Sequence, residues 1–115
     1  HRTYLAADGS GKAWEGSRKM MSYPDPITGS VLGAAIRLGM PVRGVVGIAE
    51  GLETALSASV MSGIPVWSCC FAGSVQAFQL PPGVTTVYVW GEKDVKGTGQ
   101  AAAEKCIERL RKLGV

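Results

Sequence analysis

Runs of apolar residues alternate with amphipathic stretches along the chain from residue 44 onward. Short apolar runs rich in Val, Ile and Trp are typical of buried strands, whereas apolar residues three or four positions apart are typical of helices. Strands that alternate with helices predict βαβ units, and so a parallel sheet flanked by helices. The predicted elements are strands over 44–49, 66–69 and 84–90 and helices over 52–61, 74–78 and 98–113.

The helix predicted over 98–113 has the clearest pattern and stands close to the end of the sequence. Its apolar residues recur at three-to-four spacing, so we expect them to form a buried face. They are Ala102, Cys106, Ile107, Leu110 and Leu113. Gly114 then closes the helix and the sequence stops at Val115, where a further strand would normally begin. We therefore expect the final strand of the sheet to be truncated.

The first third of the chain has a different texture, rich in Gly, Ser and Pro. Strand-like pieces at 3–6, 19–22 and 34–38 are separated by turn and loop signals. We interpret this part as a small antiparallel lead-in. The sequence is therefore divided into a β-rich, basic lead-in over 1–43 and an α/β domain over 44–115.

The composition is that of a globular domain. With 115 residues, 46% of them hydrophobic and 18% charged, the chain can build one core. No apolar stretch approaches the roughly 20 residues that a membrane span needs. The three cysteines form no Cys-x-x-Cys pair and His1 is the only histidine, so we expect buried thiols rather than a zinc site. The chain begins at His1 without a charged-then-apolar leader, which favours a cytoplasmic location and a piece of a longer protein.

The net charge of +3 is unevenly placed. Residues 1–43 carry six Lys and Arg against three acids, while residues 44–115 carry six of each. This excess is compatible with a surface that contacts phosphates, and equally with a solvated basic face. The candidate phosphate-binding residues are Lys12, Arg18, Lys19, Arg37 and Arg43.

Acidic residues follow two of the predicted strands. Glu50 comes directly after the first, and Glu92 and Asp94 come after the third. Because ligands bind at the carboxyl ends of parallel strands, these carboxylates could form an oxygen-rich site for a hard divalent cation. Ordinary explanations also exist, since acids near a helix N-terminus are favoured and neighbouring lysines could pair with the acidic loop. Glu53 lies in the first turn of the helix predicted over 52–61, where an acid ordinarily compensates the positive end of the helix dipole.

Other familiar motifs do not fit. The Gly-Ser-Gly-Lys at 9–12 has Ala6 where a P-loop needs its first glycine, and no Ser or Thr follows the lysine. Residues 97–102 match a dinucleotide-binding pattern, but six residues separate Gly97 from Trp90 at the end of the preceding strand. With its single histidine at the terminus, the chain has no Ser-His-Asp or Cys-His set.

Several segments together resemble the Toprim domain of phage- and plasmid-type DNA primases, and the resemblance covers nearly the whole chain. The most specific is Glu-Gly-Leu-Glu-Thr-Ala-Leu at 50–56. The other segments are Gly-Ile-Pro-Val at 63–66, Leu-Pro-Pro-Gly-Val at 80–84, Glu-Lys-Asp-Val-Lys-Gly at 92–97, and the lead-in pieces 2–13 and 33–38.

The resemblance implies a Toprim fold, in which a parallel sheet lies between helices. Glu50 falls on the family's glutamate after the first strand, followed by Gly51, and Asp94 falls on the second aspartate of its Asp-x-Asp pair, with Gly97 three residues beyond. Glu92 departs from the pattern, since it stands where the family usually has the first aspartate. The missing final strand is a second departure.

The function implied by the resemblance is Mg²⁺-dependent nucleotidyl transfer in primer synthesis, by a primase or primase-helicase. Glu92 and Asp94 would hold Mg²⁺ (or Mn²⁺), and Glu50 would complete the site or assist proton transfer. The implied partners are single-stranded DNA template, nucleoside triphosphates and other domains of the parent protein, with no membrane. Two alternatives stay open: a catalytically degenerate Toprim module that binds nucleic acid or docks domains, and a Toprim nuclease. Activity is expected of the intact parent, because an isolated domain lacks the parts that hold a template.

Overall fold

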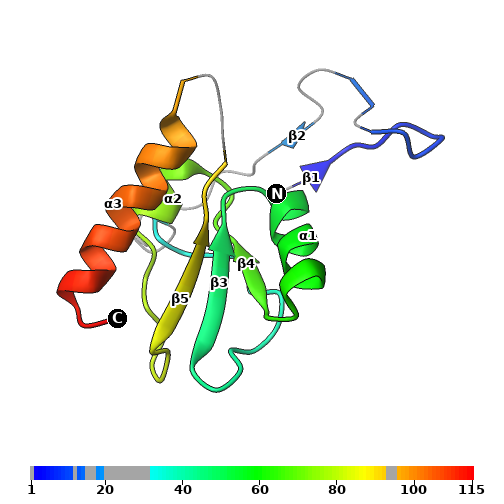
Figure 1. Ribbon diagram of the computed structural model, residues 1–115. Helices are drawn as coiled ribbons and strands as arrows, with labels where there is room; N and C mark the ends of the chain where they lie inside the picture. Colours follow the sequence, from blue (N-terminus) through cyan, green and yellow to red (C-terminus); the bar gives the residue numbers. More distant parts are fainter. Residues whose placement is uncertain (1, 12, 15–17, 20–31, 93–95) are drawn as a thin grey trace, which may run out of the picture.

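The computed structural model describes residues 2–11, 13–14, 18–19, 32–92 and 96–115. In these parts the chain forms a three-stranded parallel sheet flanked by helices and a two-stranded antiparallel pair (Figure 1). None of the described helices is long and apolar enough to cross a membrane. The elements are β1 (Arg2–Thr3), β2 (Arg18–Lys19), β3 (Val45–Ala49), α1 (Leu52–Ser62), β4 (Val66–Ser68), α2 (Ala72–Gln76), β5 (Thr86–Trp90) and α3 (Thr98–Lys112).

The parallel sheet has the strand order β4-β3-β5, with β3 in the centre. Four of the five residues of β3 are buried, as expected for a parallel strand that is covered on both faces. Its last residue, Ala49, lies beside Ser68 of β4 and Trp90 of β5. All three strands therefore end at the same edge of the sheet, which confirms the predicted α/β architecture.

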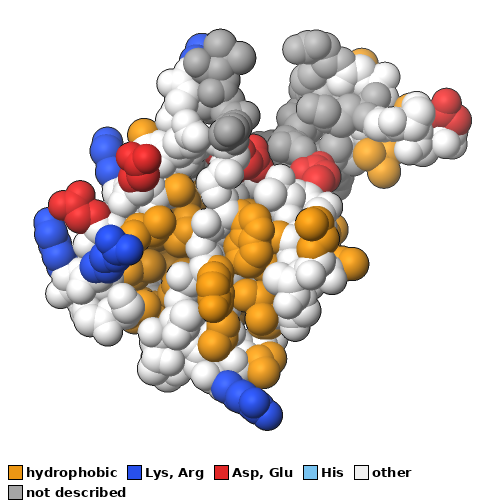
Figure 2. All heavy atoms as spheres, viewed as in Figure 1, with side chains coloured by type: hydrophobic (Ala, Val, Ile, Leu, Met, Phe, Trp, Pro, Cys, Tyr) orange, Lys and Arg blue, Asp and Glu red, His pale blue; other side chains and the backbone are white. Residues whose placement is uncertain are grey.

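The helices cover the two faces unequally. α1 packs on β3 and β4 through small residues, Ala55 and Ala58, while α2 and α3 pack together on the opposite face (Figure 1). Over β5 the face beside α1 is open, and hydrophobic side chains gather there (Figure 2). Tyr88 on this strand is 54% exposed. The core between the sheet and α2 and α3 consists of Val46, Ile48, Trp67, Cys69, Val75, Phe78, Val84, Ala102, Cys106 and Leu110.

The structure corrects two details of the predicted helices. α2 begins at Ala72, two residues before the predicted start, and Phe78 lies beyond its end. There the ring of Phe78 fills the core edge-on to Trp67, with 6.3 Å between ring centroids. Leu113, which its spacing predicts on the buried face of α3, is 62% exposed. The reason is that the helix ends at Lys112, so Leu113 lies in the turn that follows.

Part of the predicted lead-in packs directly on the sheet. Ile36 exchanges two backbone hydrogen bonds with Ser68, at 2.7 and 3.2 Å, and so runs antiparallel along the outer edge of β4. The indole nitrogen of Trp67 donates to the carbonyl oxygen of Gly39 at 2.8 Å. Residues 32–43 are therefore held against β4 by both backbone and side-chain contacts.

The three thiols differ in burial, and this difference predicts their reactivity. Cys69 and Cys106 are buried, whereas Cys70 is half-buried. Burial raises the pKa of the Cys69 thiol to about 12 and also raises the pKa of Cys106. Because the thiolate is the reactive form, we expect iodoacetamide at pH 8 to alkylate Cys70 first and the other two only after unfolding. Tandem mass spectrometry of labelled peptides checks this order, and rapid labelling of Cys69 in the folded chain would contradict it.

Candidate functional site

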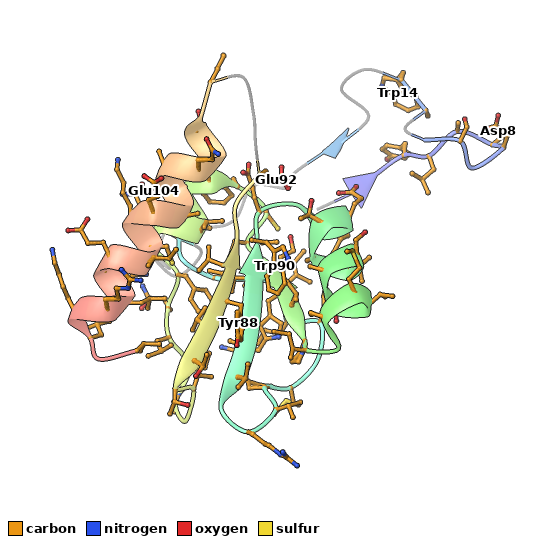
Figure 3. All side chains as sticks on the ribbon, viewed as in Figure 1. Asp8, Trp14, Tyr88, Trp90, Glu92 and Glu104 are labelled. Carbon is orange, nitrogen blue, oxygen red and sulfur yellow. The ribbon has the colours of Figure 1, made fainter. Side chains whose placement is uncertain are left out.

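The candidate site lies where β3 and β5 end side by side. Ala49 is paired with Trp90, so the chain leaves both strands at the same level of the sheet. Glu50 follows β3 directly, and Glu92 lies just beyond the end of β5 (Figure 3). Both residues are half-buried. The structure thus places two of the three predicted carboxylate residues at one edge, while Asp94 lies outside the described residues.

The side chain of Glu92 reaches from β5 to the first turn of α1. There the hydroxyl of Thr54 donates a hydrogen bond to Oε1 of Glu92 at 2.8 Å. Both residues are half-buried, so this bond is partly shielded from water and holds the carboxylate in place. Sequence reasoning missed Thr54. Its place one helical turn beyond Glu50 is the signal that could have identified it.

The start of α1 leaves room for this carboxylate because residue 51 is a glycine. Gly51 is the N-cap of α1 and has extended backbone, and no side chain caps the helix. A Cβ on Gly51 would lie 3.1 Å from Oε1 of Glu92 and 3.7 Å from Oε2 of Glu53. Two carboxylates therefore approach the same backbone position, where the helix dipole favours negative charge. Glu53, expected only to compensate the helix dipole, also borders the site.

The start of α3 supports Glu92 from its backbone side. Gly99, buried in the first turn, comes so close that a Cβ there would lie 2.8 Å from the carbonyl oxygen of Glu92. Gly97, the N-cap of α3, has a φ of +69°, a left-handed conformation that glycine adopts without strain. The two glycines let the chain pass from the site into α3 with Glu92 in close contact.

The backbone at Glu50 is fixed from the side of β4. Its carbonyl oxygen accepts a hydrogen bond from the N–H of Cys70 at 2.7 Å and another from the hydroxyl of Ser68 at 3.0 Å. Ser68 is fully buried. These two bonds join the ends of β3 and β4, so β4 helps to fix the backbone position of Glu50.

The oxygen donors at this edge suit a hard divalent cation. Mg²⁺ is usually bound in proteins by one or two carboxylates, and it keeps several waters or takes phosphate oxygens. Glu50 and Glu92 are carboxylates of this kind. Within the described ranges, no group of three or more Asp, Glu, His or Cys side chains could hold a metal ion. Glu50 and Glu92 therefore fit a cation that also takes water and phosphate oxygens as ligands.

Two of the five predicted phosphate-binding residues lie in the segment that precedes β3. The guanidinium of Arg37 sits 4.9 Å from the ring centroid of Trp67, a cation–π contact on the segment beside β4. Arg43 precedes β3 and so lies at the opposite end of that strand from Glu50. A strand of five residues is about 16 Å long, so Arg43 and Glu50 do not contact the same phosphate.

The other three predicted phosphate-binding residues belong to the N-terminal segment. Arg18 and Lys19 form β2, which pairs with β1 antiparallel, as the sequence predicts for the lead-in. In Figure 1 this pair lies toward the end of the molecule at which the parallel strands finish. Lys12 lies outside the described residues.

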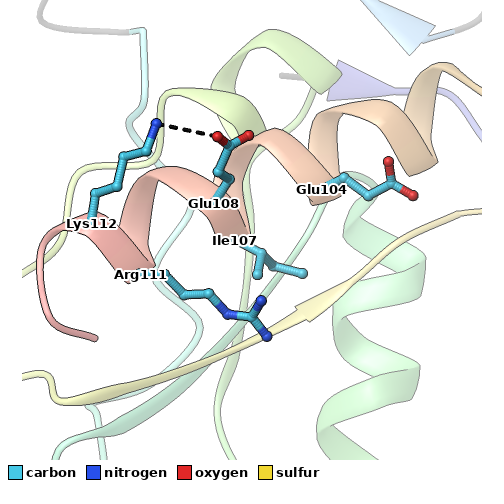
Figure 4. Close-up of a pocket in the computed structure, with 5 residues that line it drawn as sticks. All are labelled: Glu104, Ile107, Glu108, Arg111 and Lys112. Atoms are coloured by element: carbon cyan, nitrogen blue, oxygen red, sulfur yellow. Dashed lines mark ion pairs between the residues drawn. The ribbon is translucent and has the colours of Figure 1, made fainter.

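A hollow of about 590 Å³ lies on α3, away from the acidic edge (Figure 4). Lys112 and Glu108 form an ion pair of 3.2 Å across one helical turn within it. Both side chains are largely exposed, so the pair adds little to stability. The hollow shares no residue with the site and is assigned no role. Its lining consists of Glu104, Ile107, Glu108, Arg111 and Lys112.

Comparison with known families identifies the family of this domain. A model of the Toprim domain matches residues 45–115, which run from β3 to beyond α3 and include Glu50 and Glu92. Neither the curated proteins nor the solved structures give a match. Toprim domains are found in primases, topoisomerases and nucleases, and they typically bind Mg²⁺. Because the match spans well over half of the chain and the fold agrees with it, this chain belongs to the Toprim domain family.

Proposed function

We propose that this Toprim domain performs Mg²⁺-dependent nucleotidyl transfer in RNA primer synthesis, as the catalytic domain of a phage or plasmid DNA primase or primase-helicase. The main support is that Glu50 and Glu92 follow adjacent strands that end at one edge of the sheet, with the Glu92 carboxylate held by Thr54. The resemblance of the lead-in to the segment that precedes Toprim in such primases favours primer synthesis over other Toprim reactions. Part of that lead-in, residues 32–43, packs on the Toprim sheet itself.

In this proposal Glu92 and Asp94 hold one or two Mg²⁺ ions, for which Mn²⁺ can substitute, and Glu50 completes the site or assists proton transfer. A cation held there would supply positive charge to the phosphate oxygens in a reaction in which a primer 3′-hydroxyl attacks the α-phosphate of a ribonucleotide and pyrophosphate leaves. The chain itself contributes position. The sheet fixes the backbone of Glu50, and Thr54 fixes the carboxylate of Glu92.

Binding of single-stranded DNA template and nucleoside triphosphates falls in this proposal to basic side chains of the lead-in and to other domains of the parent protein, in the cytoplasm. Lys and Arg contacts to phosphate position a strand without reading its sequence. The side chains proposed for this role are Lys12, Arg18, Lys19, Arg37 and Arg43. In this proposal Arg37, which lies beside β4, and Arg43, which lies at the opposite end of β3 from Glu50, contact template outside the reacting centre.

The test is primer synthesis by the complete protein that carries this domain, on single-stranded DNA with ribonucleotides and Mg²⁺. We expect Glu50→Gln, Glu92→Gln and Asp94→Asn each to lower kcat about a hundredfold or more, because each removes a charge at the reacting phosphate. Glu104→Gln, which changes an exposed residue of α3, is the control and should leave kcat unchanged. Unchanged synthesis in the three site variants would refute the proposal, and Mg²⁺-dependent strand cleavage without nucleotide addition would indicate a nuclease.

One observation favours a degenerate module as the second candidate. A glutamate occupies position 92, where the family usually has aspartate, and its carboxylate is engaged by Thr54. Mg²⁺ titration followed by NMR decides between the two candidates. Site-specific shifts at Glu50 and Glu92 below about 10 mM metal, the range of weak carboxylate sites, support catalysis. Their absence supports the degenerate module.

A further inference from the structure

The hydrogen bond from Thr54 makes the two carboxylate oxygens of Glu92 inequivalent. Thr54 donates to Oε1, and the same oxygen is the one nearest to Gly51. Oε1 thus faces the first turn of α1. The oxygen that Thr54 does not engage, Oε2, is the one that Glu92 can offer to a ligand without breaking this bond.

The length of the glutamate side chain is what makes this bond possible. With the Glu92 backbone held against Gly99 in α3, the side chain must cross from β5 to α1. It arrives at Thr54 with an oxygen-to-oxygen distance of 2.8 Å. An aspartate at position 92 is one methylene shorter, which is about 1.5 Å, so from the same backbone it would fall outside hydrogen-bond range.

We propose that Thr54 is a positioning residue that makes Glu92 a one-oxygen ligand and thereby biases the site toward Mg²⁺ and against Ca²⁺. The inference rests on the proposed function, because it takes a divalent cation to bind at Glu92. Mg²⁺ requires near-octahedral coordination, which a carboxylate that offers a single, fixed oxygen satisfies. Ca²⁺ takes six to eight oxygens and readily binds both oxygens of one carboxylate, which the bond to Thr54 opposes.

The experiment measures the affinities of the chain for Mg²⁺ and Ca²⁺ by competition with Mn²⁺, followed by electron paramagnetic resonance. Outer residues that orient a metal ligand typically contribute about 10–100-fold to metal affinity. We therefore expect Thr54→Val, which keeps the shape and removes the hydroxyl, to weaken Mg²⁺ binding about tenfold and Ca²⁺ binding by less than about threefold. Thr54→Ser retains the hydroxyl and should restore both the affinity for Mg²⁺ and the preference.

Two controls separate positioning from a loss of structure. Ser57→Ala removes a hydroxyl from the exposed side of α1 and should change neither affinity. In a Glu92→Asp background, where the side chain no longer reaches α1, Thr54→Val should have less than about a twofold effect on Mg²⁺ affinity, since the bond it would break is absent.

The inference would be overturned if Thr54→Val weakened the binding of Mg²⁺ and Ca²⁺ equally, or if Thr54→Ser did not restore the affinity for Mg²⁺. The proposed function would be unaffected, because primer synthesis tests it separately. Unchanged Mg²⁺ affinity in Thr54→Val would overturn the inference in the same way. If the unmodified chain binds none of the three metals, the inference and the metal-dependent function fail together.

Discussion

Gly33→Ala is expected to destabilise the domain by about 3 to 4 kcal/mol, the largest effect of any single methyl group that we predict. Gly33 has a φ of +85°, which costs a residue with a side chain about 1–2 kcal/mol. A Cβ there would also overlap the carbonyl group of Ala77 at the end of α2. To relieve the overlap, Gly33 must move and weaken its hydrogen bonds to Ser74 and Gln79, which accounts for the rest.

Gly63→Ala is the matched control for this prediction. Gly63 ends α1 with a φ of +75°, close to that of Gly33, but a Cβ there would meet no atom within 4 Å. It should therefore show the backbone strain alone, about 1 kcal/mol. Urea unfolding followed by circular dichroism measures both variants. Equal losses of stability would contradict the close packing of Gly33 against Ala77.

Gly47→Ala is expected to cost about 2 to 3 kcal/mol through overpacking of the central strand. Gly47 lies in the middle of β3 with ordinary backbone, so no strain of the φ angle is involved. A Cβ would lie 2.6 Å from Cζ3 of Trp90 and 2.8 Å from Cγ2 of Val66. The ring of Trp90 lies over β3 in the space that the missing side chain leaves.

A double-mutant cycle isolates the part of this cost that comes from the ring. Trp90→Leu removes the six-membered ring that a Cβ on Gly47 would strike. In that background Gly47→Ala should cost only about 1 kcal/mol, the remainder coming from Val66. If the double variant loses as much unfolding free energy as the two single variants lose together, the ring does not lie over Gly47.

Hydrophobic patterning predicts most of the α/β body because local sequence determines it. The apolar run of β3 and the spacing of Ala102, Cys106 and Leu110 on α3 suffice to place a buried strand and an amphipathic helix. That Glu50 and Glu92 follow strands that end at the same edge of the sheet then follows from parallel topology. Element ends are less predictable, since the start of α2 depends on where Phe78 finds room in the core.

Hydrophobic patterning does not predict contacts between residues that are far apart in the sequence. Thr54 and Glu92 are 38 positions apart, and nothing in either local sequence specifies that the glutamate crosses to the first turn of α1. Arg37 reads as a free basic residue, yet its guanidinium stacks on Trp67 because the chain around Ile36 lies along β4. Such pairings depend on the tertiary arrangement of whole elements.

The contact between Ile36 and Ser68 also bears on self-association. An uncovered strand edge exposes backbone groups that can pair with another chain, which is a route to aggregation. By exchanging both hydrogen bonds with Ser68, Ile36 occupies the outer edge of β4 near its carboxyl end. In the part of the chain that the structure describes, β5 has a sheet neighbour on one side only. Among the described residues, the carboxyl end of β4 is therefore covered by Ile36, whereas the outer edge of β5 is open to pairing with another strand.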